Sequence, residues 1–177
     1  MFIPGEFIAV LTFPGVIVHE FAHQLFCRFS RVAIADVCYF RYGNPSGYVV
    51  HETPRKLYQH ILIGIGPFFV NTIIGALITL PAALPVIQFK SGGGLLDFFL
   101  IWLGVSIAMH SFPSIGDAQS IWQAVWRKET PIFIKLIGVP VVGLIYCGAV
   151  GSVVWLDLFY GIGIAMLIPN LLIKMLA

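Results

Sequence analysis

Residues 13–27 read FPGVIVHEFAHQLFC, an apolar run in which His19, Glu20 and His23 fall within about one helical turn. The apolar character begins at about residue 7, so the segment approaches the roughly 20 residues that a helix needs to cross a ~30 Å hydrocarbon core. Ionisable side chains inside such a helix are costly, and by default they mark a functional site. The segment therefore predicts a transmembrane helix that carries chemistry.

The composition of the whole chain indicates that lipid is its main solvent. Of the 177 residues, 59% are hydrophobic and only 10% are charged, whereas soluble domains carry about 25% charged residues. A soluble protein of this length could not bury so much apolar surface. The formal net charge is only +2, and no block of Lys and Arg predicts nucleic-acid binding. The length allows a single domain, 1–177, and the three separated Cys predict no disulfide framework.

Five segments are apolar enough to enter or cross a bilayer. They lie at about 7–27, 57–82, 95–112, 132–155 and 158–174. Between the first two, the segment 30–55 contains two β-rich runs around the turn sequence GNPSG, which predicts a β-hairpin. A further helix at about 118–128 places two Trp on one apolar face and is expected at the membrane surface. The predicted fold class is an all-α integral membrane protein, with about five transmembrane helices and a small membrane-associated hairpin after the first.

The positions of Lys and Arg predict the orientation of the chain. If the N-terminus lies outside and the five spans alternate, every Lys and Arg except Lys90 falls on the cytoplasmic side. Cytoplasmic loops of membrane proteins usually carry such an excess of basic residues. His23 lies about one turn from Arg28, so we expect the ionisable cluster of the first span towards the cytoplasmic side.

His19-Glu20-Phe21-Ala22-His23 is an H-E-x-x-H motif. At 3.6 residues per turn the two imidazoles share one helix face, about 6 Å apart along the axis, so both can reach one metal ion. Zinc lowers the pKa of a bound water towards about 7, and Glu20, at a neighbouring angle, can accept the proton of that water. The motif predicts one Zn²⁺ per chain, held by His19 and His23, with Glu20 as the general base of a hydrolytic reaction.

A catalytic zinc site usually has three protein ligands and one open position for water. We favour Asp117 as the third ligand, because it follows the third predicted span, just past the helix-breaking Pro113, at the same surface as the histidines. An alternative role for Asp117 is to cap a helix that begins at Ala118. The other candidates for the third ligand are His110, Glu52, His51, His60 and Glu129.

Four features follow one another along the chain: the motif at 19–23, the β-rich segment, the sequence GPFFVN at 66–71, and the sequence PSIGD at 113–117. With these features, about residues 10–120 resemble the site-2 protease family of intramembrane zinc metalloproteases, in a minimal form without a PDZ-like domain. The resemblance implies a zinc-dependent endopeptidase that cleaves a transmembrane segment of a membrane-protein substrate, as in regulated intramembrane proteolysis. It also implies that Asp117 is a metal ligand.

The resemblance extends to two further residues, at which the chain departs from the family pattern. Asn71 corresponds to the family's Asn, which contacts the substrate or transition state, but it follows Pro67 by four residues rather than three. One extra residue turns a helix by about 100°. His110 stands where the family's Asp motif often begins with Asn, and it is a substitute hydrogen-bonding group, a partner of the metal ligands or a ligand itself.

Two other classes of protein can carry the same motif. A non-proteolytic metal-binding membrane protein, such as a metal transporter or sensor, would place polar groups along several spans, whereas the last two predicted spans contain almost none. A degenerate protease that acts only as a binding module has no evident need for Glu20. The sequence therefore favours the protease over both alternatives.

Overall fold

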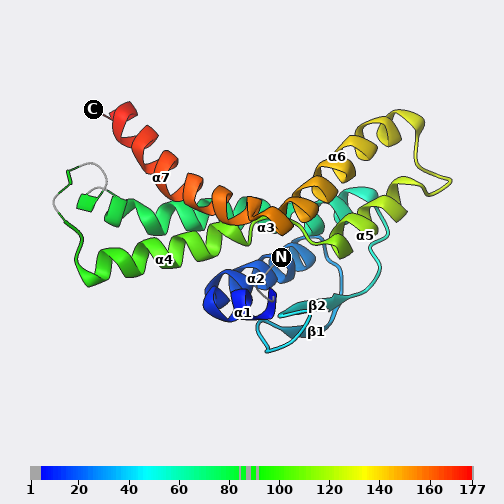
Figure 1. Ribbon diagram of the computed structural model, residues 1–177. Coiled ribbons are helices and arrows are strands. Elements are labelled where there is room, and N and C mark those ends of the chain that lie inside the picture. The colour runs from blue at the N-terminus through cyan, green and yellow to red at the C-terminus, as the bar shows by residue number, and fades with distance from the viewer. Residues whose placement is uncertain (1–4, 84, 87–88, 91, 177) are drawn as a thin grey trace.

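The computed structural model describes residues 5–176 except 84, 87–88 and 91, and most of this part of the chain is helical (Figure 1). The elements in chain order are α1 (Gly5–Leu11), α2 (Phe13–Phe29), β1 (Ile34–Cys38), β2 (Tyr48–His51), α3 (Leu57–Ala83), α4 (Leu95–Met109), α5 (Ile115–Val125), α6 (Ile132–Gly151), the short 3₁₀ helix η2 (Ser152–Val154) and α7 (Leu156–Leu176). The predicted fold class is confirmed in its coarse form, a helical protein with one small hairpin after the first apolar segment.

Helix α3 lies at the centre of the molecule and packs against α2, α4, α5 and α7. Figure 1 shows α3, α4 and α7 running alongside one another, while α6 rises away from them and packs mainly on α5. Two glycines allow α3 and α4 to come into close contact. A Cβ atom added at Gly75 would lie 2.8 Å from the carbonyl oxygen of Gly104, so only a small residue fits there.

The first apolar segment is not one straight helix. Helices α1 and α2 are bent by 91° at Thr12. Pro14 follows the break and cannot continue the helix, because it lacks an N–H and its ring clashes with the carbonyl four residues back. Side chains bind the carbonyls at the break: the Thr12 hydroxyl donates to Ile8 O at 2.7 Å, and Trp102 Nε1 donates to Leu11 O at 3.2 Å.

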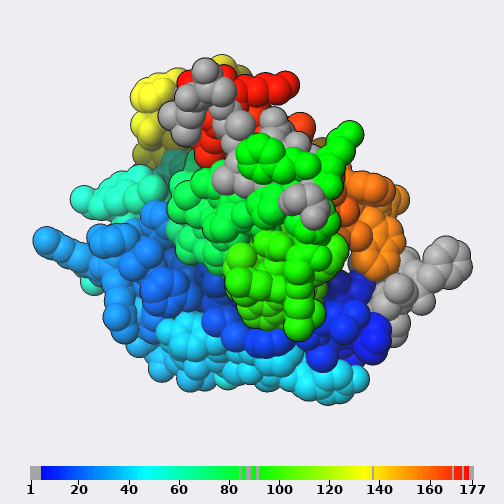
Figure 2. All heavy atoms as spheres, turned by 90° about the vertical axis from the view of Figure 1, so that its left-hand side faces the viewer, coloured from blue at the N-terminus to red at the C-terminus, as the bar shows by residue number. Residues whose placement is uncertain are grey.

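The predicted hairpin is confirmed. Strands β1 and β2 pair antiparallel, with Cys38 opposite Tyr48 and Val37 opposite Val49. The sheet has these two strands, so in the described part of the chain one edge of each strand has no strand partner. Ile34 and Val49 pack on a buried cluster that includes Cys27 of α2 and Ile63 of α3. Figure 2 shows the hairpin, in cyan, along the edge of the molecule beneath the blue helices.

The structure contains fewer candidate membrane spans than the five predicted. Within the described residues, Leu57–Ala83 and Ile132–Val154 are long and apolar enough to cross a bilayer, and the bent pair of α1 and α2 adds a third if it counts as one span. Helix α4 has only 15 residues, about 22 Å against a core of about 30 Å. The apolar part of α7 is also short. The predicted span at 95–112 extends three residues beyond α4, which ends at Met109 because the chain turns at His110.

Candidate metal centre

The H-E-x-x-H motif lies on α2, on the face that packs against α3 and α4. Gly15, one turn before His19, brings α2 close to α4, because a Cβ atom there would collide with the carbonyl of Ser106. This close packing leaves His23 only 8% exposed. The two histidines therefore point into the molecule rather than to its surroundings, as a functional cluster requires.

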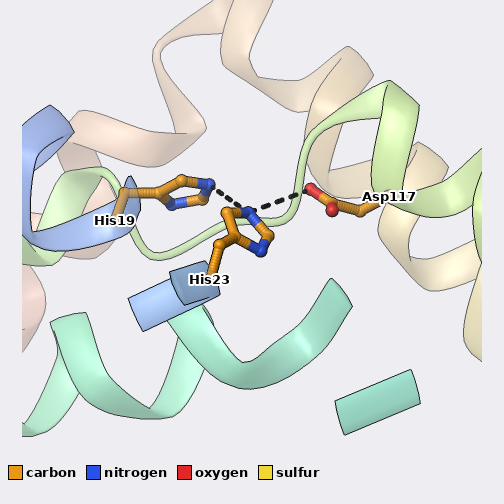
Figure 3. A group of neighbouring side chains, drawn as sticks. All are labelled: His19, His23 and Asp117. Carbon is orange, nitrogen blue, oxygen red and sulfur yellow. Dashed lines mark hydrogen bonds and ion pairs between the residues drawn. The ribbon is translucent and has the colours of Figure 1, made fainter. Parts of the chain in front are cut away.

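Asp117 joins the two histidines from a different helix, the first turn of α5 (Figure 3). His23 Nε2 lies 3.1 Å from His19 Nε2 and 3.6 Å from Asp117 Oδ2. One ligand atom from each of the three residues lies within 4.8 Å of the others. Figure 3 shows the ring of His23 between the ring of His19 and the carboxylate. In the described part of the chain this is the one such group of three possible metal ligands.

The hydrogen bond of the Nδ1 atom fixes the tautomer of each histidine ring. His19 Nδ1 lies 2.7 Å from the carbonyl oxygen of His110, and His23 Nδ1 lies 2.9 Å from that of Ile63. A carbonyl can only accept, so each Nδ1 carries the proton and donates it. In the neutral rings both Nε2 atoms then present lone pairs to each other at 3.1 Å. Two acceptor atoms that face each other in this way could share a proton or hold a metal ion.

The separations of the ligand atoms are compatible with a zinc ion. Zinc bonds of about 2.0–2.1 Å at tetrahedral angles place neighbouring ligand atoms about 3.3 Å apart. The separations of 3.1 Å and 3.6 Å around His23 Nε2 are close to this value. A hydrogen bond to a carboxylate would be shorter than 3.6 Å, about 2.7–3.2 Å. The donor set of two imidazoles and one carboxylate is also one of the usual sets at catalytic zinc, so the residues fit the metal.

Asp117 has a second partner, at the start of its own helix. Its Oδ2 atom accepts from Ser114 N at 2.8 Å and from Ser114 Oγ at 2.6 Å, while Asp117 N donates back to Ser114 Oγ at 3.2 Å. This is a capping box in which Ser114 is the N-cap residue. Asp117 therefore caps a helix, as the alternative role predicts. The predicted start of that helix is wrong, because α5 begins at Ile115 and not at Ala118. The oxygen that caps α5 is therefore the same one that faces His23.

Glu20 lies beside this group with a free carboxylate. No side chain or backbone group in the described residues donates a hydrogen bond to it. The turn of the hairpin packs closely against the Glu20 side chain, since a Cβ atom added at Gly47 would lie 2.7 Å from Glu20 Cγ. A carboxylate that is held by packing but not hydrogen-bonded remains available to accept a proton.

His110 and Asn71 do not join the metal group through their side chains. The His110 imidazole points to the helix break, where its Nε2 atom lies 2.8 Å from Thr12 Oγ1. Asn71 is fully buried and donates to main-chain carbonyls, and it lines neither of the two cavities beside the group. His110 acts on His19 only through its carbonyl oxygen.

The remaining candidates for the third ligand also lie outside the group. His60 is buried between α3 and α5, with its Nδ1 atom 2.8 Å from Ser120 Oγ and its Nε2 atom 2.9 Å from Pro54 O. His51 Nδ1 donates to the carbonyl of Glu52. Glu129 lines a separate cavity near the end of α5. Of the six candidates, the structure brings only Asp117 to the two histidines.

Two cavities of about 620 and 640 Å³ meet at the metal group. The residues that line both are His19, Glu20, Pro45, Gly47, Ser114 and Ile115. The first cavity follows β2 towards His51 and His60, and the second extends towards Glu6 and Asp157. Tyr48 lines the first, and its hydroxyl donates to Asp36 Oδ2 at 3.0 Å. This hydrogen bond raises the pKa of Tyr48, so its hydroxyl stays neutral.

Sequence reasoning missed several parts of the site. The carbonyls of Ile63 and His110 orient the histidines. Because every residue has a main-chain carbonyl, the sequence does not reveal such contacts. The close contact of Gly47 with Glu20 depends on how the hairpin folds back. Ser114, in contrast, had a readable signal, because Ser-x-x-Asp before an apolar run is a capping-box pattern.

No protein-family model, no curated protein and no solved structure matches the chain.

Proposed function

We propose that the chain is a zinc-dependent endopeptidase of the site-2 protease type, which cleaves a transmembrane segment of a membrane-protein substrate. The observation that carries this proposal is the pair of Nε2 atoms that face each other at 3.1 Å while both Nδ1 atoms donate to carbonyls. An unshared carboxylate, Glu20, stands next to this pair. A pure metal carrier needs the first feature and has no use for the second.

The proposed reaction divides the work between the metal and the protein. Zn²⁺, held by His19 Nε2, His23 Nε2 and Asp117, supplies Lewis acidity for peptide hydrolysis. Glu20 takes the proton of the attacking water as its oxygen bonds to the peptide carbon. The same carboxyl then gives this proton to the amide nitrogen as the C–N bond breaks. The carbonyls of Ile63 and His110 keep the rings oriented throughout.

The substrate has to reach the metal group in an extended form, because a peptide bond inside a helix is sterically shielded. An unwound strand cannot leave its N–H and C=O groups unpaired in hydrocarbon. Strand β2 offers a solution, since Tyr48, Val49 and His51 line the first cavity and the strand has a free edge. We infer that the substrate pairs with this edge, as in β-augmentation.

The proposal includes the membrane and an orientation. The apolar helices α3 and α6 support a location in the lipid bilayer. The N-terminus is proposed to lie outside and the metal group towards the cytoplasmic side. Basic residues gather at the ends of α2 and α5 and at the start of α3, on elements that pack together. This arrangement agrees with the excess of positive charge inside.

The variant Glu20→Gln tests the function directly. We expect it to bind zinc like the wild type, because the ligands are unchanged, and to lose at least about 100-fold in cleavage rate, because the general base is gone. The substrate is a synthetic transmembrane peptide with a central Asn-Pro pair that loosens its helix, in detergent and in vesicles, with products identified by mass spectrometry. Zinc content is measured on the same samples.

Two outcomes would count against the protease. Wild-type protein that contains zinc and cleaves none of a panel of such peptides contradicts it, as does full activity of Glu20→Gln. The alternative, a metal transporter, makes two different predictions. Vesicles that contain the wild-type protein should take up Zn²⁺, and neither the wild type nor Glu20→Gln should cleave the peptides.

A further inference from the structure

Asn71 is a fully buried amide on α3 that joins three elements. Its Nδ2 atom lies 3.3 Å from Gly15 O on α2, 3.2 Å from Ile107 O on α4 and 3.1 Å from His110 O just past the end of α4. All three partners are main-chain carbonyls. Asn71 thus acts as a donor at the point where α2, α3 and the end of α4 meet.

The shortest of these contacts reaches the metal group through one atom. The His110 carbonyl follows the last residue of α4, and it accepts from His19 Nδ1 at 2.7 Å and from Asn71 Nδ2 at 3.1 Å. A carbonyl oxygen has two lone pairs, so these two donors satisfy it completely. The position of this oxygen fixes the rotation of the His19 ring, and Asn71 fixes the oxygen.

The other end of the amide supports the same interpretation. Asn71 Oδ1 is buried and has no hydrogen-bond partner. Burying an unpaired amide oxygen is unfavourable, and a residue that only filled space, such as Leu, would avoid this penalty. We therefore attribute the role of Asn71 to its Nδ2 atom, which donates to the main-chain carbonyls. Because Asn71 lines neither cavity beside the metal group, its place does not fit a contact with substrate.

We propose that Asn71 is a positioning residue of the metal centre, acting on His19 through the main-chain carbonyl of His110. The inference rests on the proposed zinc site but not on the cleavage reaction. Without the amide the carbonyl is held by one donor, and His19 can rotate its Nε2 atom away from His23. Partners that orient a metal-bound histidine typically contribute 10–100-fold to metal affinity.

The test compares zinc affinities of purified protein in detergent, measured by competition with a chromophoric chelator. Asn71→Leu should bind zinc about 10–100-fold more weakly than the wild type. Thr79→Val is the matched control, because Thr79 is also fully buried on α3 but donates only to carbonyls of its own helix, Gly75 and Ala76. This control should bind zinc like the wild type.

Two further readouts separate positioning from folding. Circular dichroism of the metal-free proteins shows whether Asn71→Leu folds. If it does not fold, Asn71→Asp replaces it in the test, because Asp keeps the side-chain volume and has at most one hydrogen-bond donor. Cobalt absorption should change in the Asn71 variant alone. Cleavage lost at low zinc should return when zinc is raised, which a purely structural defect would not allow.

A folded Asn71 variant with wild-type zinc affinity would overturn the inference, as would an equal loss of affinity in Thr79→Val. If the wild type binds zinc but cleaves no peptide, the proposed function fails, while the affinity series still decides the role of Asn71.

Discussion

At the scale of single residues, Asp117 caps α5 and is also the proposed third zinc ligand. Its Oδ2 atom caps α5 through Ser114 and faces His23 at 3.6 Å. The two roles differ in what they require, because a cap needs only an acceptor, whereas a zinc ligand gains from negative charge. Substitutions can therefore separate the two roles.

Asp117→Asn keeps an acceptor for the Ser114 N–H and removes the charge. We expect its zinc affinity to fall at least about 10-fold, with little change in the thermal midpoint of the metal-free protein. Ser114→Ala should show the opposite pattern, with a loss of about 1 kcal/mol in stability and a smaller effect on zinc. Chelator competition and thermal melts measure both. Unchanged zinc binding in Asp117→Asn would mean that another residue is the third ligand.

The histidine pair shows what a sequence can predict at this scale. His19 and His23 converge because the helix repeat places residues four apart on one face, and the motif contains that information. Asp117 required an argument about depth in the membrane, since 94 residues separate it from His23. For Asn71 the sequence offers a contact with substrate or a supporting role behind the metal ligands, and the structure places its amide against main-chain carbonyls.

At the scale of elements, the hairpin closes over the motif. Gly47, in the turn, leaves no room for a side chain, because a Cβ atom would lie 2.7 Å from Glu20 Cγ and 2.9 Å from Tyr39 O. The turn and the helix are therefore matched in shape at Glu20, the proposed general base.

Gly47→Val should displace Glu20 while leaving the histidines in place. Misplacing a catalytic group by about 1 Å can reduce a rate about 100-fold, so we expect cleavage to fall by about that factor with zinc content unchanged. Val50→Ala, at an exposed position of the same hairpin, serves as the control and should cleave normally. Normal cleavage by Gly47→Val would show that the turn can move away from Glu20.

Elements differ in how well a sequence predicts them. The hairpin follows from β-forming runs on either side of a Gly- and Pro-rich turn, and α3 follows from a long apolar run. The break at Thr12 lies inside an apolar run that predicts one continuous span. Composition cannot locate such a break, and the five predicted segments compare with two or three candidate spans in the described residues.

At the scale of the whole molecule, the metal group links parts that are distant in the chain. The ligands come from α2 and α5, and the carbonyls that orient them come from α3 and the end of α4. An ion bound here connects four helices. Binding to the folded state alone stabilises a protein, by about 2.7 kcal/mol when the free ligand is 100 times its Kd.

Removing the metal should therefore lower the thermal midpoint of the wild-type protein in detergent, as followed by circular dichroism with and without a chelator. The double variant His19→Ala, His23→Ala should melt at one temperature in both conditions, because it has no ion to lose. If the thermal midpoint of the wild-type protein is the same with and without the chelator, the folded protein does not hold zinc.

In the proposed membrane location, the short helices around the site would affect the surrounding lipid. Helix α4 covers about 22 Å and α2, with 17 residues, about 26 Å. A bilayer thins where the hydrophobic stretch within it is shorter than its core. Headgroups and their water would then approach His19 and His23 from the bulk phase, and the water of the proposed hydrolysis would have a shorter distance to travel.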